Sequence, residues 1–368
     1  MLLNKFLGII LQSPATIMLL NCDHPLTLLS YSDVPPRVIE NFILTGYRFP
    51  NYSFRDCILS AFRPTNETGN FWTHFLPVFV FAYYFAEVFD WEGVPSGDHP
   101  FFYPLWNYFL CVSSLLMCSS LAHLLNAMSV VVREVCFFVD YGTISAYTVG
   151  SSLAYHYYIH PRPGVVETKG NTTHNGVLES SEFKLFFETL YIPSACVVAV
   201  ICLLFCCNTR QKWRHHRYII RTLVFLLPFL VSSTPIFYRL IQSPYSTASV
   251  FFYRHCLWLL ASAVFNISKV PERLAPGHFD IWGHSHQWFH CCTFLSILDE
   301  LHMIKSEVRV ILVGSAALPP GPTVAATYGV MLFLQTTILS IIVAFSWHAN
   351  CIYGPLRDQL ATKQQKCH

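Results

Sequence analysis

The sequence predicts an all-α polytopic membrane protein, and three observations carry this prediction. Hydrophobic residues make up 53% of the 368 residues and charged residues only 12%, about half the charged share of an ordinary soluble domain. The mean hydropathy of the chain is positive, at +0.42. Eight stretches of about 20 mostly apolar residues follow one another, each long enough to cross a bilayer as a helix. We therefore expect a bundle of membrane-spanning helices.

Residues 1–70 precede the first apolar stretch and are expected to form a cytoplasmic region with amphipathic helices. Residues 37–48 follow two prolines, which suit the first turn of a helix. Their apolar side chains can share one helical face with helical spacing: Val38, Phe42 and Ile43. Residues 53–62 are a second short helical candidate, and both candidates are expected to lie on the inner membrane surface. The apolar residues 1–20 are interpreted either as a cleaved signal peptide or as a disordered or membrane-surface tail.

The eight expected spans share their length and apolar character, with Trp or Tyr near several ends, as membrane interfaces favour. They cover residues 71–89, 103–128, 135–159, 183–207, 218–241, 248–270, 282–303 and 325–347. The seventh of these is more polar than the others. Residues 71–349 are therefore expected to form the transmembrane bundle, and residues 350–368 a cytoplasmic tail.

The distribution of Lys and Arg predicts the orientation of the bundle, because loops on the cytoplasmic side are enriched in both. Four basic residues lie within residues 210–217 after the fourth span, whereas the loop after the first span has none. Both termini are therefore expected to be cytoplasmic. The sequon at Asn171 then lies outside and can be glycosylated, whereas those at Asn51 and Asn66 cannot. A net charge of only +2 without a Lys/Arg-rich run excludes a nucleic-acid-binding surface.

Ionisable side chains inside spans are costly, so each one requires an explanation. His123, Asp140, His286 and His290 lie in three different spans, and the predicted topology places all four near the cytoplasmic face. His286 and His290 are four residues apart and project from one helical face, so they can share a metal ion. His123 would complete a three-histidine set with one open position, as in catalytic zinc sites. Asp140 could orient a water or a ligand beside the metal.

A polar network that joins three helices without a metal is the alternative interpretation of these four residues. Three other histidines are given less weight. His284 faces away from the pair formed by His286 and His290, and it is interpreted as an interface residue. His255 lies near the outer end of its span with no evident partner, and His74 begins the first span.

The same residues lie within motifs that resemble the progestin and adipoQ receptor family, from about Ser32 to the end of the eighth span. The motifs are Gly46-Tyr47-Arg48, residues 66–74 (NETGNFWTH), Ser119-x-x-x-His123, Asp140-Tyr141, Pro271-Glu272-Arg273 and residues 283–290 (GHSHQWFH). The resemblance implies a seven-helix, adiponectin-receptor-like core followed by an eighth C-terminal span. It also implies a zinc ion held by His123, His286 and His290, with Asp140 holding a water and Ser119 accompanying it.

Within that family the chain most resembles the membrane progestin receptors. The eighth span, residues 271–277 (PERLAPG) and His284-Ser285-His286 carry this similarity, and residues 265–269 and 293–297 most resemble the epsilon type. Trp288 departs from the pattern, because the family usually has a smaller aliphatic residue at this position. It lies on another face of the helix than the histidine pair, so it is expected to alter the pocket more than the metal site.

The resemblance implies a plasma-membrane receptor for progestins or related steroids that signals to cytosolic cyclic-nucleotide pathways. Its expected partners are a steroid or lipid small molecule, membrane lipids and, as candidates, G proteins. The alternative function is a zinc-dependent, ceramidase-like hydrolase of a lipid amide, in which Asp140 and Ser119 would be catalytic. A zinc ion that only holds the bundle together is a third interpretation.

Overall fold

The computed structural model describes residues 28–48, 52–160, 185–213, 216–242, 247–314, 318 and 320–365. Across these residues the chain is helical and contains no β-strand, and a single isolated bridge pairs Leu29 with Tyr47. The prediction of an all-α polytopic bundle is therefore confirmed. The expectations for residues 1–20 and for the sequons at Asn51 and Asn171 concern positions outside the described residues.

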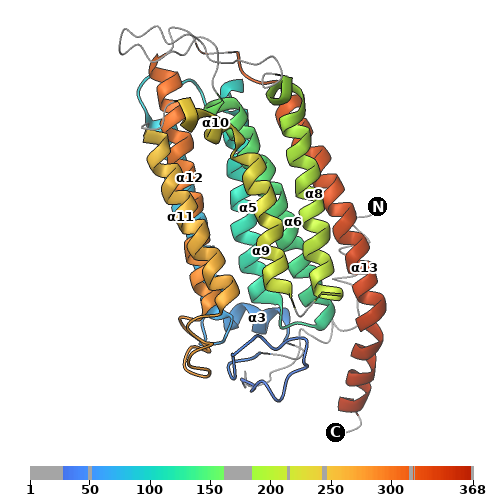
Figure 1. The fold of residues 1–368 in the computed structure, drawn as a ribbon. Helices are drawn as coiled ribbons and strands as arrows, with labels where there is room; N and C mark the ends of the chain where they lie inside the picture. The colour runs from blue at the N-terminus through green and yellow to red at the C-terminus, as the bar shows by residue number, and fades with distance from the viewer. Residues whose placement is uncertain are drawn as a thin grey trace.

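Helical segments of the described residues occupy the positions of all eight expected spans (Figure 1). They are α4 (Thr68–Ala86), α5 (Tyr103–Leu125), α6 (Val130–Ala154), α8 (Tyr191–Gln211), α9 (Arg217–Ser232) with α10 (Thr234–Gln242), α11 (Thr247–Ser268), α12 (Ser285–Gly314) and α13 (Val330–Gln365). Short 3₁₀ or π turns flank them at Glu87–Asp90, Pro100–Phe102, Tyr155–Ile159, Phe186–Leu190 and Ala325–Gly329. α12 and α13 extend well past the expected ends of their spans, so the last helix continues into the expected tail.

Seven helices close into a ring, and the eighth lies outside it. Around the ring, α4 packs on α5, α5 on α6, α6 on α8, α8 on α9, α9 on α11, α11 on α12 and α12 on α4. α13 packs against the outer face of α6 and α8 (Figure 1). The absence of a side chain at Gly142 on α6 permits this approach, because a Cβ atom there would lie 2.8 Å from Ile342 and 2.9 Å from Ile338 of α13. The expected seven-helix core with an added eighth helix is therefore present.

Apolar side chains cover much of the outer surface of the bundle, as expected for a membrane protein. Large apolar side chains are exposed on outward faces, including Leu257 (61%) and Phe333 (72%), as lipid-facing positions require. By length and hydropathy, four helical segments of the described chain could cross a membrane: Pro100–Leu125, Phe186–Gln211, Thr247–Ser268 and Ala325–Gly354. α9 and α10, which bend by 55°, make a fifth if they form one span. α4, α6 and α12 are less apolar, partly because they carry ionisable residues that the ring buries, among them His74, Asp140 and Glu300.

The amphipathic helix predicted for residues 37–48 is wrong. Phe42 (φ 65°) and Gly46 (φ 85°) adopt left-handed backbone conformations, which interrupt a right-handed helix. The apolar residues instead pack together in a compact series of turns: Val34, Val38, Ile43 and Tyr47. The backbone N–H of Thr45 donates a hydrogen bond to the Asp280 carboxylate at 2.7 Å, which ties this segment to the loop before α12.

The second short helix is present as α3 (Phe54–Ser60). Its N-cap is a capping box, in which the Ser53 hydroxyl accepts from the Asp56 N–H at 3.1 Å and the Asp56 carboxylate accepts from the Ser53 N–H at 3.2 Å. With residues 28–48, α3 covers the lower end of the bundle in Figure 1, here called the α3 end. The opposite end, beside α10, is called the α10 end. α5 finishes and α12 starts at the α3 end, which sets the location of the histidines.

Candidate metal centre and ligand cavity

Three histidine rings meet at the α3 end of the bundle. His123 comes from the last turn of α5, and His286 and His290 come from the first two turns of α12. One ring nitrogen from each lies within 4.8 Å of the other two. The Nε2 atoms of His123 and His286 are 3.3 Å apart. The structure therefore brings together the three histidines that the sequence nominated as metal ligands.

One pair of ring nitrogens in this group has the separation found in a tetrahedral metal site. At the zinc–nitrogen distance of 2.0–2.1 Å, two ligand nitrogens of a tetrahedral site are separated by about 3.3 Å. The observed separation of the His123 and His286 Nε2 atoms, 3.3 Å, matches this value. His123 and His290 are buried, and His286 is shielded by the ring of Phe289, which stacks on it. Three imidazoles with one open position are the donor set of catalytic zinc sites.

Side chains from other parts of the sequence hold His123 in position. Its Nδ1–H donates to Glu67 Oε2 at 2.8 Å, which fixes the tautomer and directs the Nε2 lone pair toward the other two histidines. The second oxygen of Glu67 accepts from Asn126 Nδ2 at 2.6 Å. The buried Arg48 guanidinium donates to the backbone carbonyls of His123 (2.6 Å) and Leu124 (3.0 Å). The last turn of α5, and His123 with it, is thus fixed in position.

The histidines of α12 are positioned by the helix N-terminus and by α4. Glu272 accepts the backbone N–H of Ser285 at 2.7 Å and also the Ser285 hydroxyl, so a carboxylate caps the positive end of α12. His290 Nδ1 lies 3.2 Å from the Asn70 carbonyl and 3.0 Å from Thr73 Oγ1. Because a carbonyl only accepts, Nδ1 carries the proton and the Nε2 lone pair is left for a metal.

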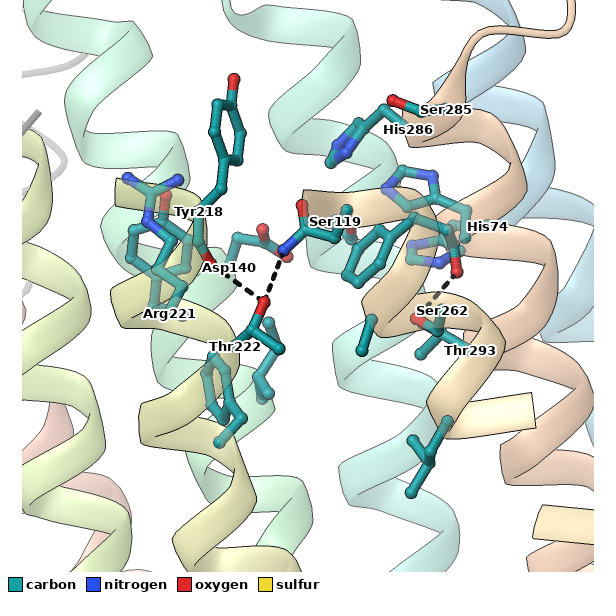
Figure 2. Close-up of a pocket in the computed structure, with 18 of the residues that line it drawn as sticks. His74, Ser119, Asp140, Tyr218, Arg221, Thr222, Ser262, Ser285, His286 and Thr293 are labelled. Atoms are coloured by element: carbon teal, nitrogen blue, oxygen red, sulfur yellow. Dashed lines mark hydrogen bonds between the residues drawn. The ribbon is translucent and has the colours of Figure 1, made fainter. Parts of the chain in front are cut away.

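Asp140 lies beside the three nitrogens without belonging to their group. Its Oδ1 atom is buried and has no hydrogen-bond partner among the described residues. Ser119, one helical turn before His123, interacts with the same carboxylate. Figure 2 shows Asp140 and His286 directed toward the cavity between them. An unpaired acceptor next to three imidazoles suits a water or a ligand hydroxyl, since burying it without a partner is unfavourable.

A cavity of about 580 Å³ extends from this group into the bundle. All five nominated site residues line it, with apolar and aromatic walls from α5, α6, α9, α11 and α12: Leu115, Phe137, Ile144, Phe225, Leu226, Phe229, Leu259 and Phe289. The volume is in the range of cavities that enclose drug-sized ligands, and such cavities are mainly apolar with a few polar groups.

Two further residues that contact the histidine group were not nominated from the sequence. Glu67 holds His123, and His74 stacks on His290 with ring centroids 3.7 Å apart while neither of its nitrogens has a partner in the described part of the chain. Both belong to the NETGNFWTH motif, and with Asn70 they recur every three or four residues on one face of α4. This spacing of polar residues, next to the first expected span, is the sequence pattern that could have identified them.

Packing and hydrogen bonds account for two other histidines, His284 and His255. His284 lies outside the three-nitrogen group, and its Nε2 atom bonds the Asn66 carbonyl at 3.1 Å. The expectation that His255 has no partner is wrong, because its Nδ1 atom lies 3.0 Å from the Ser296 carbonyl. Trp288 is half exposed on another face of α12 than the histidine pair and stacks on Phe265.

Comparison with known proteins identifies the family of the chain. Residues 62–300 match the family model described as haemolysin-III related. The chain belongs to this family, that of the progestin and adipoQ receptors. The chain is 34% identical to human membrane progestin receptor gamma over 286 residues, which cover 75% of this chain and 80% of that protein. It is 30% identical to human membrane progestin receptor delta over 359 residues, covering 92% and 98%.

The similarity extends to the zebrafish relative named membrane progestin receptor gamma-A, at 30% identity over 342 residues. The predicted family resemblance is therefore confirmed, and this progestin and adipoQ receptor family member is a polytopic membrane protein. The assignment to the epsilon type stays a prediction.

Ion pairs close the cavity of this family member at its α3 end. Glu40, which lines the cavity, contacts Arg133 at 2.8 Å and Arg217 at 3.2 Å. Burial raises the pKa of Glu40, but the positive charges of Arg217 and Arg133 outweigh it and lower this pKa to about 2. The Lys269 ammonium lies 3.5 Å from the centre of the Tyr218 ring. Charge at this end is thus paired rather than free.

Proposed function

We propose that this chain is a plasma-membrane receptor for progestins or related steroids, with a zinc site near the cytoplasmic face. The observation that carries the proposal is the 580 Å³ apolar cavity that has the three histidines and Asp140 at one end. A steroid is a rigid apolar body with polar groups at its ends, so it matches a cavity of this shape and polarity. Relatives named membrane progestin receptors support the same ligand class.

Each residue of the site would have a separate role. His123, His286 and His290 would hold zinc, which supplies a divalent charge that can polarise a ligand oxygen. Glu67 keeps His123 in the tautomer that leaves Nε2 free, and the Asn70 carbonyl does the same for His290. Asp140 would accept a hydrogen bond from a hydroxyl or water at this end of the ligand.

The orientation and signalling output belong to the same proposal. With both termini in the cytosol, the α3 end and residues 28–48 face the cytoplasm. Glu40 lines the cavity and pairs with Arg217, so a ligand near it would shift the position of this segment. That segment is the surface through which ligand occupancy would reach cyclic-nucleotide pathways, with G proteins as candidate partners.

Saturation binding of tritiated progesterone to the purified protein in lipid nanodiscs tests the receptor function. We expect saturable binding by wild type and a loss of tenfold or more, about 1.4 kcal/mol, in Ala263→Trp, because Ala263 lines the cavity. Ala261→Trp is the matched control, since Ala261 lies two residues earlier on α11 and is not a cavity residue. The proposal is wrong if wild type shows no saturable binding.

A zinc-dependent hydrolase of a lipid amide is the second candidate function. One observation favours it: the buried, unpaired Oδ1 of Asp140 lies beside three metal-ligand histidines, where it could accept a proton from water. Ceramide hydrolysis should then be measurable in wild type, and Asp140→Asn should lower turnover by about 10²-fold or more while most of the zinc is kept. A wild-type protein that carries zinc, binds steroid and does not hydrolyse ceramide excludes this candidate.

A further inference from the structure

The cavity has a second polar end, distant from the histidines. Glu300 lines the cavity from α12 and is only 2% exposed. It lies ten residues after His290, which corresponds to about 15 Å of helix rise toward the α10 end. Within the described residues no basic side chain forms an ion pair with Glu300. A carboxylate buried at this depth without a cation requires another explanation.

Tyrosine hydroxyls hold the Glu300 carboxylate. Tyr108 of α5 donates to Oε2 at 3.0 Å, and Tyr147 of α6 donates to the same oxygen. Tyr155 interacts with this carboxylate as well. All three tyrosines act as donors, so the carboxylate acts as an acceptor. Because a carboxylate offers about four lone-pair positions, at least one remains for a group in the cavity.

His255 contributes a second acceptor at the same end. It lines the cavity from α11, is 3% exposed, and its ring packs beside Phe229 and Phe252. Its Nδ1 atom lies 3.0 Å from the Ser296 carbonyl and 2.8 Å from Ser296 Oγ, and the Ser296 hydroxyl donates to the His255 backbone carbonyl at 3.2 Å. Because a carbonyl only accepts, Nδ1–H is the donor to Ser296 and Nε2 is left with a lone pair. Ser296 is one helical turn before Glu300 on α12, which places the two acceptors near each other.

We infer that Glu300 and His255 form a hydroxyl-selective subsite, which binds the end of the ligand remote from the metal centre. The inference rests on the proposed steroid-receptor function. A ligand hydroxyl can donate to either acceptor. A ketone oxygen has lone pairs only, so it would face both acceptors without forming a hydrogen bond to either. Sites built around a buried hydrogen-bonding group discriminate strongly against a ligand that cannot complete the bond.

The distance between the two polar ends of the cavity favours a particular shape of ligand. Seven residues of α6, about 10 Å of rise, separate Asp140 at one end from Tyr147 at the other. A rigid fused-ring ligand can bridge this span while its flat faces contact the aromatic walls. A flexible fatty acyl chain would have no donor to place at Glu300. The chemical class favoured by the cavity is therefore a rigid apolar molecule with a hydroxyl at its far end.

Competition binding with three matched pregnane steroids tests this subsite. The probes are progesterone, which has ketones at both ends, its 20-hydroxy reduction product and its 3-hydroxy reduction product. We expect one hydroxylated probe to bind wild type about tenfold more tightly than progesterone, as a hydrogen bond to a charged group would provide. In Glu300→Gln this ratio should fall toward one, because the amide can donate to a ketone.

Asp299→Asn is the matched control, since it makes the same acid-to-amide change at the adjacent residue. Asp299 pairs with Arg254 at 3.0 Å and does not line the cavity, so the hydroxyl-to-ketone ratio should match wild type. If Glu300→Gln is not recovered as folded protein, His255→Phe decides the question, because an aromatic ring preserves the packing there and removes the acceptor. It too should lower the ratio.

The outcomes separate this inference from the function on which it rests. Absence of saturable steroid binding by wild type overturns both. Saturable binding with the same hydroxyl-to-ketone ratio in wild type, Glu300→Gln and His255→Phe overturns the subsite alone. A ratio that falls in the cavity variants and is unchanged in Asp299→Asn supports the subsite, because a purely structural role would weaken all three probes equally.

Discussion

Replacing Glu67 by Gln tests how far the metal centre depends on residues that do not themselves bind metal. Both Glu67 oxygens accept hydrogen bonds: Oε2 accepts from His123 Nδ1 at 2.8 Å and from Asn70 Nδ2 at 2.7 Å, and Oε1 accepts from Asn126 Nδ2 at 2.6 Å. Gln keeps the size of the side chain but has one acceptor and one donor group. Asn126 cannot turn over to compensate, because its Oδ1 atom already accepts from Arg48 at 3.0 Å.

At least one of these bonds must therefore be lost, an amide N–H must face another donor, and the bond from His123 loses its charged acceptor in either orientation of the amide. If the loss falls on His123, its ring is no longer oriented and Nε2 is no longer directed at the metal. Residues that hold metal-ligating histidines typically contribute 10–100-fold to metal affinity, which is about 1.4–2.7 kcal/mol. We expect Glu67→Gln to weaken zinc binding by this factor.

Zinc affinity can be measured by competition with a chelator of known affinity, with elemental analysis of the purified protein as the stoichiometric check. Glu40→Gln is the control, because Glu40 is also a carboxylate at the α3 end and shares the partner Arg133, but contacts no histidine of the group. Equal zinc affinity in wild type and Glu67→Gln would refute the positioning role of Glu67. A wild-type protein without zinc would refute the metal centre itself.

Three further predictions concern the ligand set, the topology and pH. His286→Ala should release most of the zinc and His284→Ala should retain it, as elemental analysis of both variants will show. A glycosidase-sensitive mass shift should vanish with Asn171→Gln and persist with Asn66→Gln, since the Asn66 side chain is buried; the opposite pattern would reverse the proposed orientation. Because the pKa of Glu40 is lowered from 4.5 to about 2, its contribution to stability is present above pH 4.5 and is lost as pH falls toward 2. The melting temperatures of wild type and Glu40→Gln should therefore differ more at pH 7 than at pH 3, and a constant difference would contradict this.

The residues of the metal centre could be nominated from the sequence because two of its features are local. The i, i+4 spacing of His286 and His290 places both rings on one helical face whatever the helix packs against. The cost of an imidazole or carboxylate within a span singled out His123 and Asp140. The family motifs then supported the same residues, and the structure places all of them on one cavity.

Local pattern was misleading in the N-terminal region. Val38 and Ile43 belong to the segment that was expected to form an amphipathic helix, and both are buried. They are buried, however, in a turn structure that depends on the left-handed backbone of Phe42 and on a hydrogen bond from Thr45 to the distant Asp280. Helical periodicity identifies which side chains are apolar, and it does not identify a tertiary partner that stabilises another backbone path.

What the sequence by itself determined is the fold class, the positions of the helices at the eight expected spans and the choice of the three histidines, because hydropathy and helical spacing are properties of short segments. The tertiary structure alone decided the remaining features. Glu67 and Arg48 reach His123 across 56 and 75 positions of the chain, and Tyr108 reaches Glu300 across 192. Such contacts depend on the order of helices around the ring and on the rotation of each helix about its axis. Neither quantity is encoded in a local period, since each is set by the packing of side chains from several helices at once.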